Sequence, residues 1–296
     1  MDAIAGRWGE IAGILAALSA ALSSLQVRGF GGSAHPMVIN ALRCGLATIG
    51  FVLLWWFGSR QYGDWQQAAP LLIICVLFGL VAGDSLYFAS ITRIGPGRST
   101  PIAMSYPLPT AVLASVVLGE RLSGLQFAGI VLGVAAIWVI AAKRQERDGV
   151  LELDRDYWFG IVFAIAASLC WSVSVLVLRP ALAMMPLDFA NLLRMGLAAL
   201  LLPVFGYPVM RKATFGTRRA RFAILIAGMG VTAVTTSYFL TASIHHSGAA
   251  VASILSSMAP VFAAPMAWLF FQEAVTLRTA LAIALGIAGI ILVVAN

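Results

Sequence analysis

Apolar residues occupy most of the chain in long runs, and polar residues are concentrated in the short stretches between these runs. Ten runs can be distinguished, each near the roughly 20 residues that an α-helix needs to cross a bilayer core. They cover approximately residues 10–28, 37–57, 68–92, 97–118, 123–142, 157–178, 187–210, 221–244, 247–271 and 275–295. The pattern predicts an all-α integral membrane protein with ten transmembrane helices, in which helix packs on helix within lipid.

The composition agrees with this prediction and narrows the expected partners. Of the 296 residues, 61% are hydrophobic and 10% are charged, whereas a soluble domain carries about a quarter charged residues. The net charge of +7 does not indicate a nucleic-acid partner, because the basic residues lie in short loops between the runs. Cys44, Cys75 and Cys170 lie inside apolar runs, so we interpret them as small core residues and expect neither a disulfide nor a metal site.

Two halves of the chain repeat each other. The stretch NALRCGLA at 40–47 matches NLLRMGLA at 191–198, with a constant offset of 151, and further along the offset becomes 153. Matching pairs at the first offset are Gly9 with Gly160, Arg28 with Arg179 and Arg43 with Arg194; pairs at the second are Gly95 with Gly248, Pro107 with Pro260 and Glu120 with Glu273.

Each copy of this unit holds five apolar runs, so we divide the chain into a first repeat, residues 1–149, and a second repeat, residues 150–296. An odd number of crossings forces the second copy to enter the membrane in the opposite direction. The sequence therefore predicts two inverted five-helix repeats. This architecture is typical of secondary transporters, because it gives one central site two similarly built gates on opposite faces.

The ends of both halves resemble a known family. They hold Pro107 and Pro109, the turn LGERL and the helix GIVLGVAAIWVI in the first half, then Pro260 and Pro265, the turn FQEAV and the helix GIAGIILVV in the second. Over its whole length the chain resembles the drug/metabolite transporter superfamily in its EamA-type branch, and most of all the YddG-type exporters of aromatic amino acids. It departs from the family pattern at Gln272, which replaces the glycine of the Gly-Glu turn.

Three ionisable residues lie well inside the runs. Arg43 and Asp84 have similar depths, about 9–12 Å from the same membrane face at ~1.5 Å per residue, so we predict a buried pair that closes one end of the bundle. A proton-coupling role for Asp84 is the alternative. Arg194 has no such acid, because Ser237 occupies the position that matches Asp84. We expect it to donate to backbone carbonyls or to Asn191, or to point toward a wet cavity. The alternative is contact with a substrate carboxylate, which suits guanidinium geometry.

Polar and aromatic residues inside the runs predict a central cavity. The expected lining residues are Tyr87, Tyr106, Trp171, Tyr238, Ser19, Ser23, Ser256 and Ser257. The four aromatic residues fall in the inner half of their runs rather than in the interfacial belt, and such a pocket suits an amphipathic metabolite. The alternative role for the serines is hydrogen bonding between helices. Four prolines are expected as hinges or static kinks in the fourth and ninth helices: Pro107, Pro109, Pro260 and Pro265.

The distribution of Lys and Arg predicts the orientation. Loops after odd-numbered runs hold 13 basic residues and those on the other face hold 4. By the positive-inside rule the first face is cytoplasmic and both termini lie outside.

No enzyme is indicated, because the chain has neither a phosphate loop nor a second aspartate facing Asp84. We expect a secondary transporter of a bacterial-type inner membrane that exports amino acids, especially aromatic or other amphipathic ones, and related metabolites by alternating access, without a cofactor. The alternatives are a proton-coupled drug exporter and a passive metabolite channel. Expected partners are the small-molecule substrate and the lipid bilayer, with no nucleic acid, and the protein is expected to be a monomer or weak dimer.

Overall fold

The structure is a computed structural model that describes residues 7–29, 36–58, 60–145, 155–207, 219–271 and 277–294, and every regular element among these residues is a helix. In chain order the elements are α2 (Trp8–Gly29), α3 (Pro36–Phe57), α4 (Trp65–Val76), the π-helix η1 (Leu77–Gly83), α5 (Asp84–Ala103), α6 (Pro107–Val117), α7 (Gly124–Gln145), α8 (Arg155–Met184), α9 (Leu187–Phe205), α11 (Arg219–Ser247), α12 (Ala249–Ser257), α13 (Ala259–Phe271) and α14 (Leu277–Val294).

Five helical segments among the described residues are long and apolar enough to cross a membrane: 37–57, 65–91, 155–184, 187–205 and 223–247. Five shorter apolar segments lie at 8–23, 107–117, 124–139, 249–263 and 280–294. Large apolar side chains such as Phe57, Val116 and Ile224 are more than two-thirds exposed, as expected of a surface that faces lipid. The all-helical membrane class is thus confirmed, whereas the count of ten complete crossings stays a prediction.

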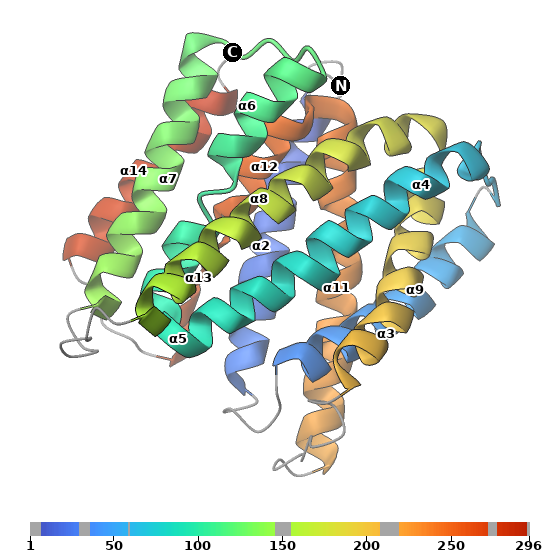
Figure 1. The fold of residues 1–296 in the computed structure, drawn as a ribbon, viewed down its shortest axis with the longest axis horizontal. Helices are drawn as coiled ribbons and strands as arrows, with labels where there is room; N and C mark the ends of the chain where they lie inside the picture. Colours follow the sequence, from blue (N-terminus) through green and yellow to red (C-terminus); the bar gives the residue numbers. More distant parts are fainter. Residues whose placement is uncertain are drawn as a thin grey trace.

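The main contacts between helices stay the same when each helix is replaced by its counterpart from the other half of the chain. Helix α2 packs along α11, and its counterpart α8 packs along α5 and α4; α3 packs on its own counterpart α9, and α7 on its counterpart α14. Figure 1 shows the α7–α14 pair at one side of the bundle, the α3–α9 pair at the other, and α4, α5 and α8 running side by side across it. Two copies of one five-helix unit are expected to show such matching contacts. The inverted orientation of the copies stays a prediction.

Close contacts at glycines show the same correspondence between the two halves, residue by residue. A Cβ on Gly9 of α2 would lie 2.8 Å from the backbone nitrogen of Ser247 in α11, and a Cβ on Gly160 of α8 would clash with Cγ2 of Ile94 in α5. Gly160 matches Gly9 at the offset of 151, and Ser247 matches Ile94 at the offset of 153. Both helix pairs therefore approach each other closely at corresponding glycines.

The two halves differ where the third and fourth apolar runs meet. The sequence predicted a connection at 93–96, but α4, η1 and α5 continue as one helical stretch from Trp65 to Ala103, which Figure 1 shows in cyan to teal. The second half breaks instead at Gly248, whose φ of 88° ends α11. Glycine adopts this conformation without a Cβ clash, whereas the backbone at 93–96 keeps its helical course.

The interruptions of the fourth and ninth helices lie directly before two of the predicted prolines. Pro107 is the first residue of α6, after a turn at 104–106, and Pro260 is the second residue of α13, after the turn at Met258. Proline fits the first turn of a helix because its missing N–H would have no helical partner there. Pro109 is the third residue of α6 and Pro265 lies inside α13, and the hinge role of all four stays a prediction.

Small residues hold α7 against α14 within one chain. A Cβ on Gly129 would lie 2.7 Å from the carbonyl oxygen of Gly289, and a Cβ on Gly289 would lie 2.9 Å from that of Gly129. These glycines are therefore used for packing inside the protein.

Candidate substrate cavity

A cavity of about 540 Å³ lies between α2, α5, α8, α9, α11 and the α12–α13 segment. Its polar and aromatic lining residues are Asp84, Tyr87, Thr100, Tyr106, Trp171, Ser174, Arg194, Thr236, Ser256 and Ser257, and its apolar lining residues include Ala16, Ala20, Leu178, Leu240 and Pro260. The volume is within the range of small-molecule sites, and both signs of charge reach the cavity from different helices.

The π-helix η1 ends immediately before Asp84 and sets the position of its carboxylate. The indole N–H of Trp171 in α8 is directed at the carbonyl oxygen of Gly79, at 3.2 Å, and at Oδ1 of Asp84, at 3.1 Å. Gly83 makes room for this ring, because a Cβ there would lie 2.7 Å from Cδ1 of Trp171. A π-helical turn is uncommon and is often found at functional sites.

Asn40 connects Asp84 to Arg43. Nδ2 of Asn40 donates to Oδ2 of Asp84 at 2.8 Å, and Oδ1 of Asn40 accepts from Nη2 of Arg43 at 2.7 Å. Among the described contacts, this amide links the charged groups of Arg43 and Asp84, and the role of the two residues as a pair stays a prediction. The amide dipole can serve both charges because it presents a donor to the anion and an acceptor to the cation.

The second half contains the same Asn–Arg unit with different surroundings. Nη1 of Arg194 donates to Oδ1 of Asn191 at 3.0 Å, and Nδ2 of Asn191 donates to the hydroxyl of Thr241 at 2.7 Å. Ser237 occupies the position that matches Asp84, and Thr241 lies one turn beyond it. Asn191 is thus bonded to a neutral hydroxyl, whereas Asn40 is bonded to a carboxylate. Nε of Arg194 is buried and has no hydrogen-bond partner among the described residues, and the same holds for the hydroxyl of Thr236.

Three aromatic rings form one wall of the cavity. The centroid of Trp171 lies 5.3 Å from that of Tyr87 and 6.0 Å from that of Tyr106, distances typical of favourable aromatic pairs. The Tyr106 hydroxyl lies 3.0 Å from Oγ of Ser256 and 3.1 Å from the carbonyl oxygen of Ser253, so it joins the α5–α6 turn to α12. The wall combines apolar area with fixed polar groups.

Of the eight predicted lining residues, the structure brings five to this cavity: Tyr87, Tyr106, Trp171, Ser256 and Ser257. Ser19 and Ser23 are not among its lining residues; Ala16 and Ala20 line it from the neighbouring stripe of the same helix, α2. Asp84 and Arg194, predicted as gate or pair residues, line the cavity, and Pro260 does so as well.

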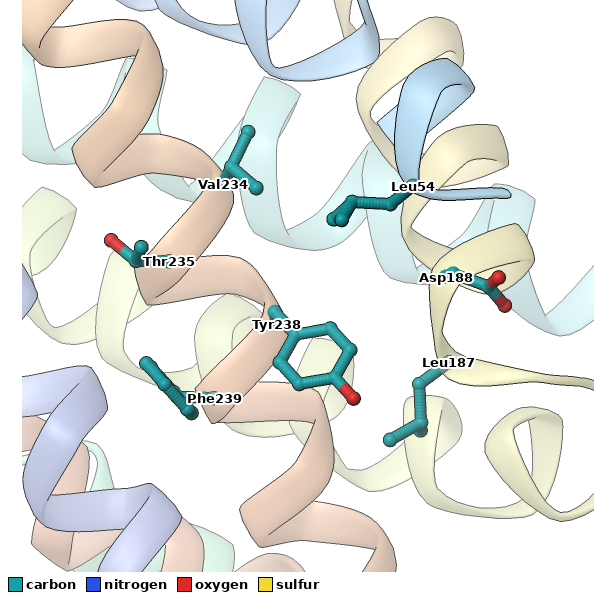
Figure 2. A pocket seen from close by; sticks show the side chains of 7 residues that line it. All are labelled: Leu54, Leu187, Asp188, Val234, Thr235, Tyr238 and Phe239. Atoms are coloured by element: carbon teal, nitrogen blue, oxygen red, sulfur yellow. The ribbon is translucent and has the colours of Figure 1, made fainter. Parts of the chain in front are cut away.

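Tyr238 lies in a different pocket. Figure 2 shows its ring directed from α11 toward Leu187 of α9, in a mainly apolar pocket of about 540 Å³ whose other lining residues are Leu54, Asp188, Val234, Thr235 and Phe239. One oxygen of Asp188, the acidic residue of this pocket, already accepts from the backbone N–H of Phe189. We place the candidate site in the central cavity because it contains the buried charges and the polar atoms without partners.

Glu120 joins three elements at one end of the bundle. Its carboxylate pairs with Arg179 of α8 and accepts the backbone N–H groups of Ala249, at 2.7 Å, and Ala250, at 3.2 Å. These amides form the first turn of α12, where the helix dipole favours a negative charge. We call Glu120, Arg179 and the 248–250 turn the Glu120 latch. The matching residues Glu273 and Arg28 lie outside the residues whose side chains the structure describes.

Sequence reasoning missed Asn40, Thr236, Gly79, Gly83 and the π-helix. Asn40 had a signal, because it begins the repeated stretch NALRCGLA and recurs as Asn191. The π-helix and the orphaned hydroxyl of Thr236 had none, because both depend on contacts between helices.

Comparisons with known proteins place these features in context. The EamA-like transporter family matches residues 7–142 and again residues 158–295. An uncharacterized transporter of Archaeoglobus fulgidus is 24% identical over 226 residues, which are 76% of each chain. A crystal structure titled only as that of a protein has a TM-score of 0.79 at 20% identity and covers 96% of this chain and 95% of its own, which shows a shared fold.

Proposed function

The chain belongs to the EamA-like transporter family, and from this premise we propose that it is a secondary transporter that exports amino acids, preferably aromatic or other amphipathic ones, and related metabolites by alternating access. Membership itself indicates a multi-pass membrane protein that transports small molecules. The substrate class, the mechanism, the export direction and the location in a bacterial-type inner membrane belong to the proposal.

The central cavity is the observation that supports this function best. It offers an aromatic wall of Tyr87, Tyr106 and Trp171 beside one carboxylate, Asp84, and one buried cation, Arg194. An amphipathic molecule that carries a charge complements such a site, because its apolar part can cover the rings while its charged group meets a charge of opposite sign. A cavity for a wholly apolar compound would not need charged groups in its lining, each costly to desolvate.

Features at one mouth of the bundle support alternating access. The Glu120 latch joins the start of α12 to α8 and to the α6–α7 connection by contacts that can separate without unfolding a helix. The breaks before Pro107 and Pro260 give α6 and α13 positions at which they can tilt.

Exchange in vesicles tests the function. Full-length protein is reconstituted into liposomes loaded with unlabelled L-phenylalanine, and labelled L-phenylalanine is added outside. A transporter is expected to accumulate label transiently by exchange, with saturation. Trp171→Ala should lower the exchange rate about tenfold, since stacking on the aromatic wall is lost. Trp138→Ala is the matched control, because that indole is 48% exposed on the bundle surface and bonds only to Ser105 among the contacts described.

Other outcomes decide between the alternatives. Label that only equilibrates, without transient accumulation, indicates a passive channel. Asp84 in the cavity makes a proton-coupled exporter of cationic drugs the second candidate, and this candidate predicts proton-gradient-driven movement of a lipophilic cation and no exchange of phenylalanine.

A further inference from the structure

Arg194 is a buried cation with unused hydrogen-bonding capacity. Its side chain is 6% exposed and lines the central cavity. Nη1 is bonded to Asn191, but Nε has no acceptor, and no carboxylate among the described residues forms an ion pair with this guanidinium. A buried charge without a counter-ion is costly, so the arrangement favours binding of an anion.

Thr236 provides a second orphaned group in the same cavity. Its hydroxyl is buried, has no partner among the described residues and belongs to α11, which packs against α9, the helix that carries Arg194. Buried polar groups are almost always bonded, so two such groups lining one cavity are an unusual combination. A hydroxyl and a guanidinium together suit the oxygens of a carboxylate.

Comparison of the two Asn–Arg units explains why the anion belongs at Arg194. In the first half, the protein supplies a carboxylate from Asp84, which is bonded to Asn40 and to Trp171. In the second half, Asn191 meets the neutral Thr241 instead. The first cation is thus balanced within the protein, and the second has no protein carboxylate among the described residues to balance it.

We propose that Arg194 and Thr236 form a carboxylate-binding subsite of the central cavity, so that the transported molecules are carboxylic acids whose apolar part lies against the wall of Tyr87, Tyr106 and Trp171. The inference rests on the proposed transport of small amphipathic molecules and adds which group of the substrate is recognised. Asp84 already accepts two N–H groups in the described structure, so the subsite requires the carboxylate and does not require an amino group.

Four related probes test the subsite on the full-length protein in detergent, by thermal stabilisation and by competition with labelled L-phenylalanine. They are L-phenylalanine, 3-phenylpropionate without the amino group, phenethylamine without the carboxylate, and L-phenylalaninamide with the carboxylate neutralised. We expect the first two to bind with similar affinity. The last two should bind at least tenfold more weakly, because each lacks the anion that a charged hydrogen bond requires.

Variants test which residues cause the preference for acids over the amine and the amide. Arg194→Gln should weaken both acids at least tenfold and reduce the ratio of acid to amide affinity toward one, and Thr236→Val, which keeps the side-chain shape, should weaken both acids several-fold. Arg43→Gln is the matched control, because this arginine occupies the corresponding position but is bonded toward Asp84 through Asn40. Arg43→Gln is expected to change the stability of the protein and to leave the ratio of acid to amide affinity unchanged.

The outcomes separate this inference from the proposed function. If phenylalanine is exchanged in vesicles but the amine and the amide bind as tightly as the acids, the carboxylate subsite is wrong and the transport function stands. An unchanged acid-to-amide ratio in folded Thr236→Val and Arg194→Gln protein also overturns the subsite. If no acid binds while a lipophilic cation does, the proposed function fails as well.

Discussion

The amide of Asn40 donates a hydrogen bond over 2.8 Å to the carboxylate of Asp84, a residue 44 positions later in the chain. The same amide accepts from Arg43 one turn along α3, so a single neutral side chain lies between two partly buried charges. An intervening amide lowers the cost of burying both charges, because each keeps a hydrogen bond where a direct contact is not made.

The first prediction is that the energetic coupling between Arg43 and Asp84 depends on Asn40. Arg43→Gln and Asp84→Asn should each destabilise the protein, and the double variant should be milder than their sum by about 1 kcal/mol or more. In an Asn40→Ala background this coupling should fall close to zero, as measured by thermal unfolding in detergent. Asn191→Ala in the second half is the control and should leave the coupling intact. Coupling that persists without Asn40 would indicate a direct pair.

A second prediction concerns the fit between η1 and Trp171. Gly83→Ala adds a Cβ that would lie 2.7 Å from the indole and 2.8 Å from the carbonyl oxygen of Phe78, so the ring and η1 cannot keep their present fit beside Asp84. Exchange of phenylalanine should fall roughly as far as in Trp171→Ala. Gly45→Ala is the matched control, because no atom lies within 4 Å of the added Cβ, and removal of a helical glycine should stabilise the protein by about 0.5–1 kcal/mol. Equal transport by both variants would show that the ring position is unimportant.

The two tyrosines that the sequence treated alike should behave differently. Tyr106→Phe removes the hydroxyl that bonds to Ser256 and to the Ser253 carbonyl, so unfolding free energy should drop by about 1–2 kcal/mol and phenylalanine binding should weaken. Tyr238→Phe should change neither, because that ring lies in the other pocket (Figure 2). Calorimetry and the competition assay measure both effects. A binding defect in Tyr238→Phe would place the substrate in the pocket of Figure 2 instead.

The Glu120 latch is expected to keep one mouth of the bundle closed. Glu120→Ala removes both the pair with Arg179 and the acceptors for the first turn of α12, and should destabilise the protein by about 1–3 kcal/mol. In a background with the three native cysteines replaced by alanine, Val251→Cys should react several-fold faster with a membrane-impermeant maleimide once Glu120 is changed. Glu120→Gln keeps an acceptor for Ala249 and should be intermediate. Unchanged labelling in folded Glu120→Ala protein would make the latch a static cap.

Orientation is tested by fusions. Alkaline phosphatase, which is active only outside the cytoplasm, should be active after Asn296 and inactive after Arg147, because the stretch at 143–147 is basic. A fluorescent protein at the same two positions should give the reverse pattern. The opposite result with both reporters would reverse the assigned faces.

Several features of this protein follow from its sequence. Runs of apolar residues determine the membrane class and most helix ends, but not the end between the third and fourth runs, because lipid leaves a chain few ways to satisfy its backbone. The family resemblance, confirmed at the level of the EamA family, likewise rests on local motifs such as LGERL. Five of the eight predicted cavity residues also line the central cavity, because polar and aromatic side chains are costly to leave in lipid.

Tertiary structure decided which face of each helix reaches the cavity. The rotation of α2 brings Ala16 and Ala20 to it, and Tyr238 of α11 faces α9. Such rotations depend on side chains of neighbouring helices, as Gly9 against Ser247 illustrates, and hydropathy along one helix does not contain that information. The same holds for Asn40 between Arg43 and Asp84, and for Arg194. The sequence places both cations inside apolar runs, but only the packing of separate helices decides which one is bonded toward a protein carboxylate.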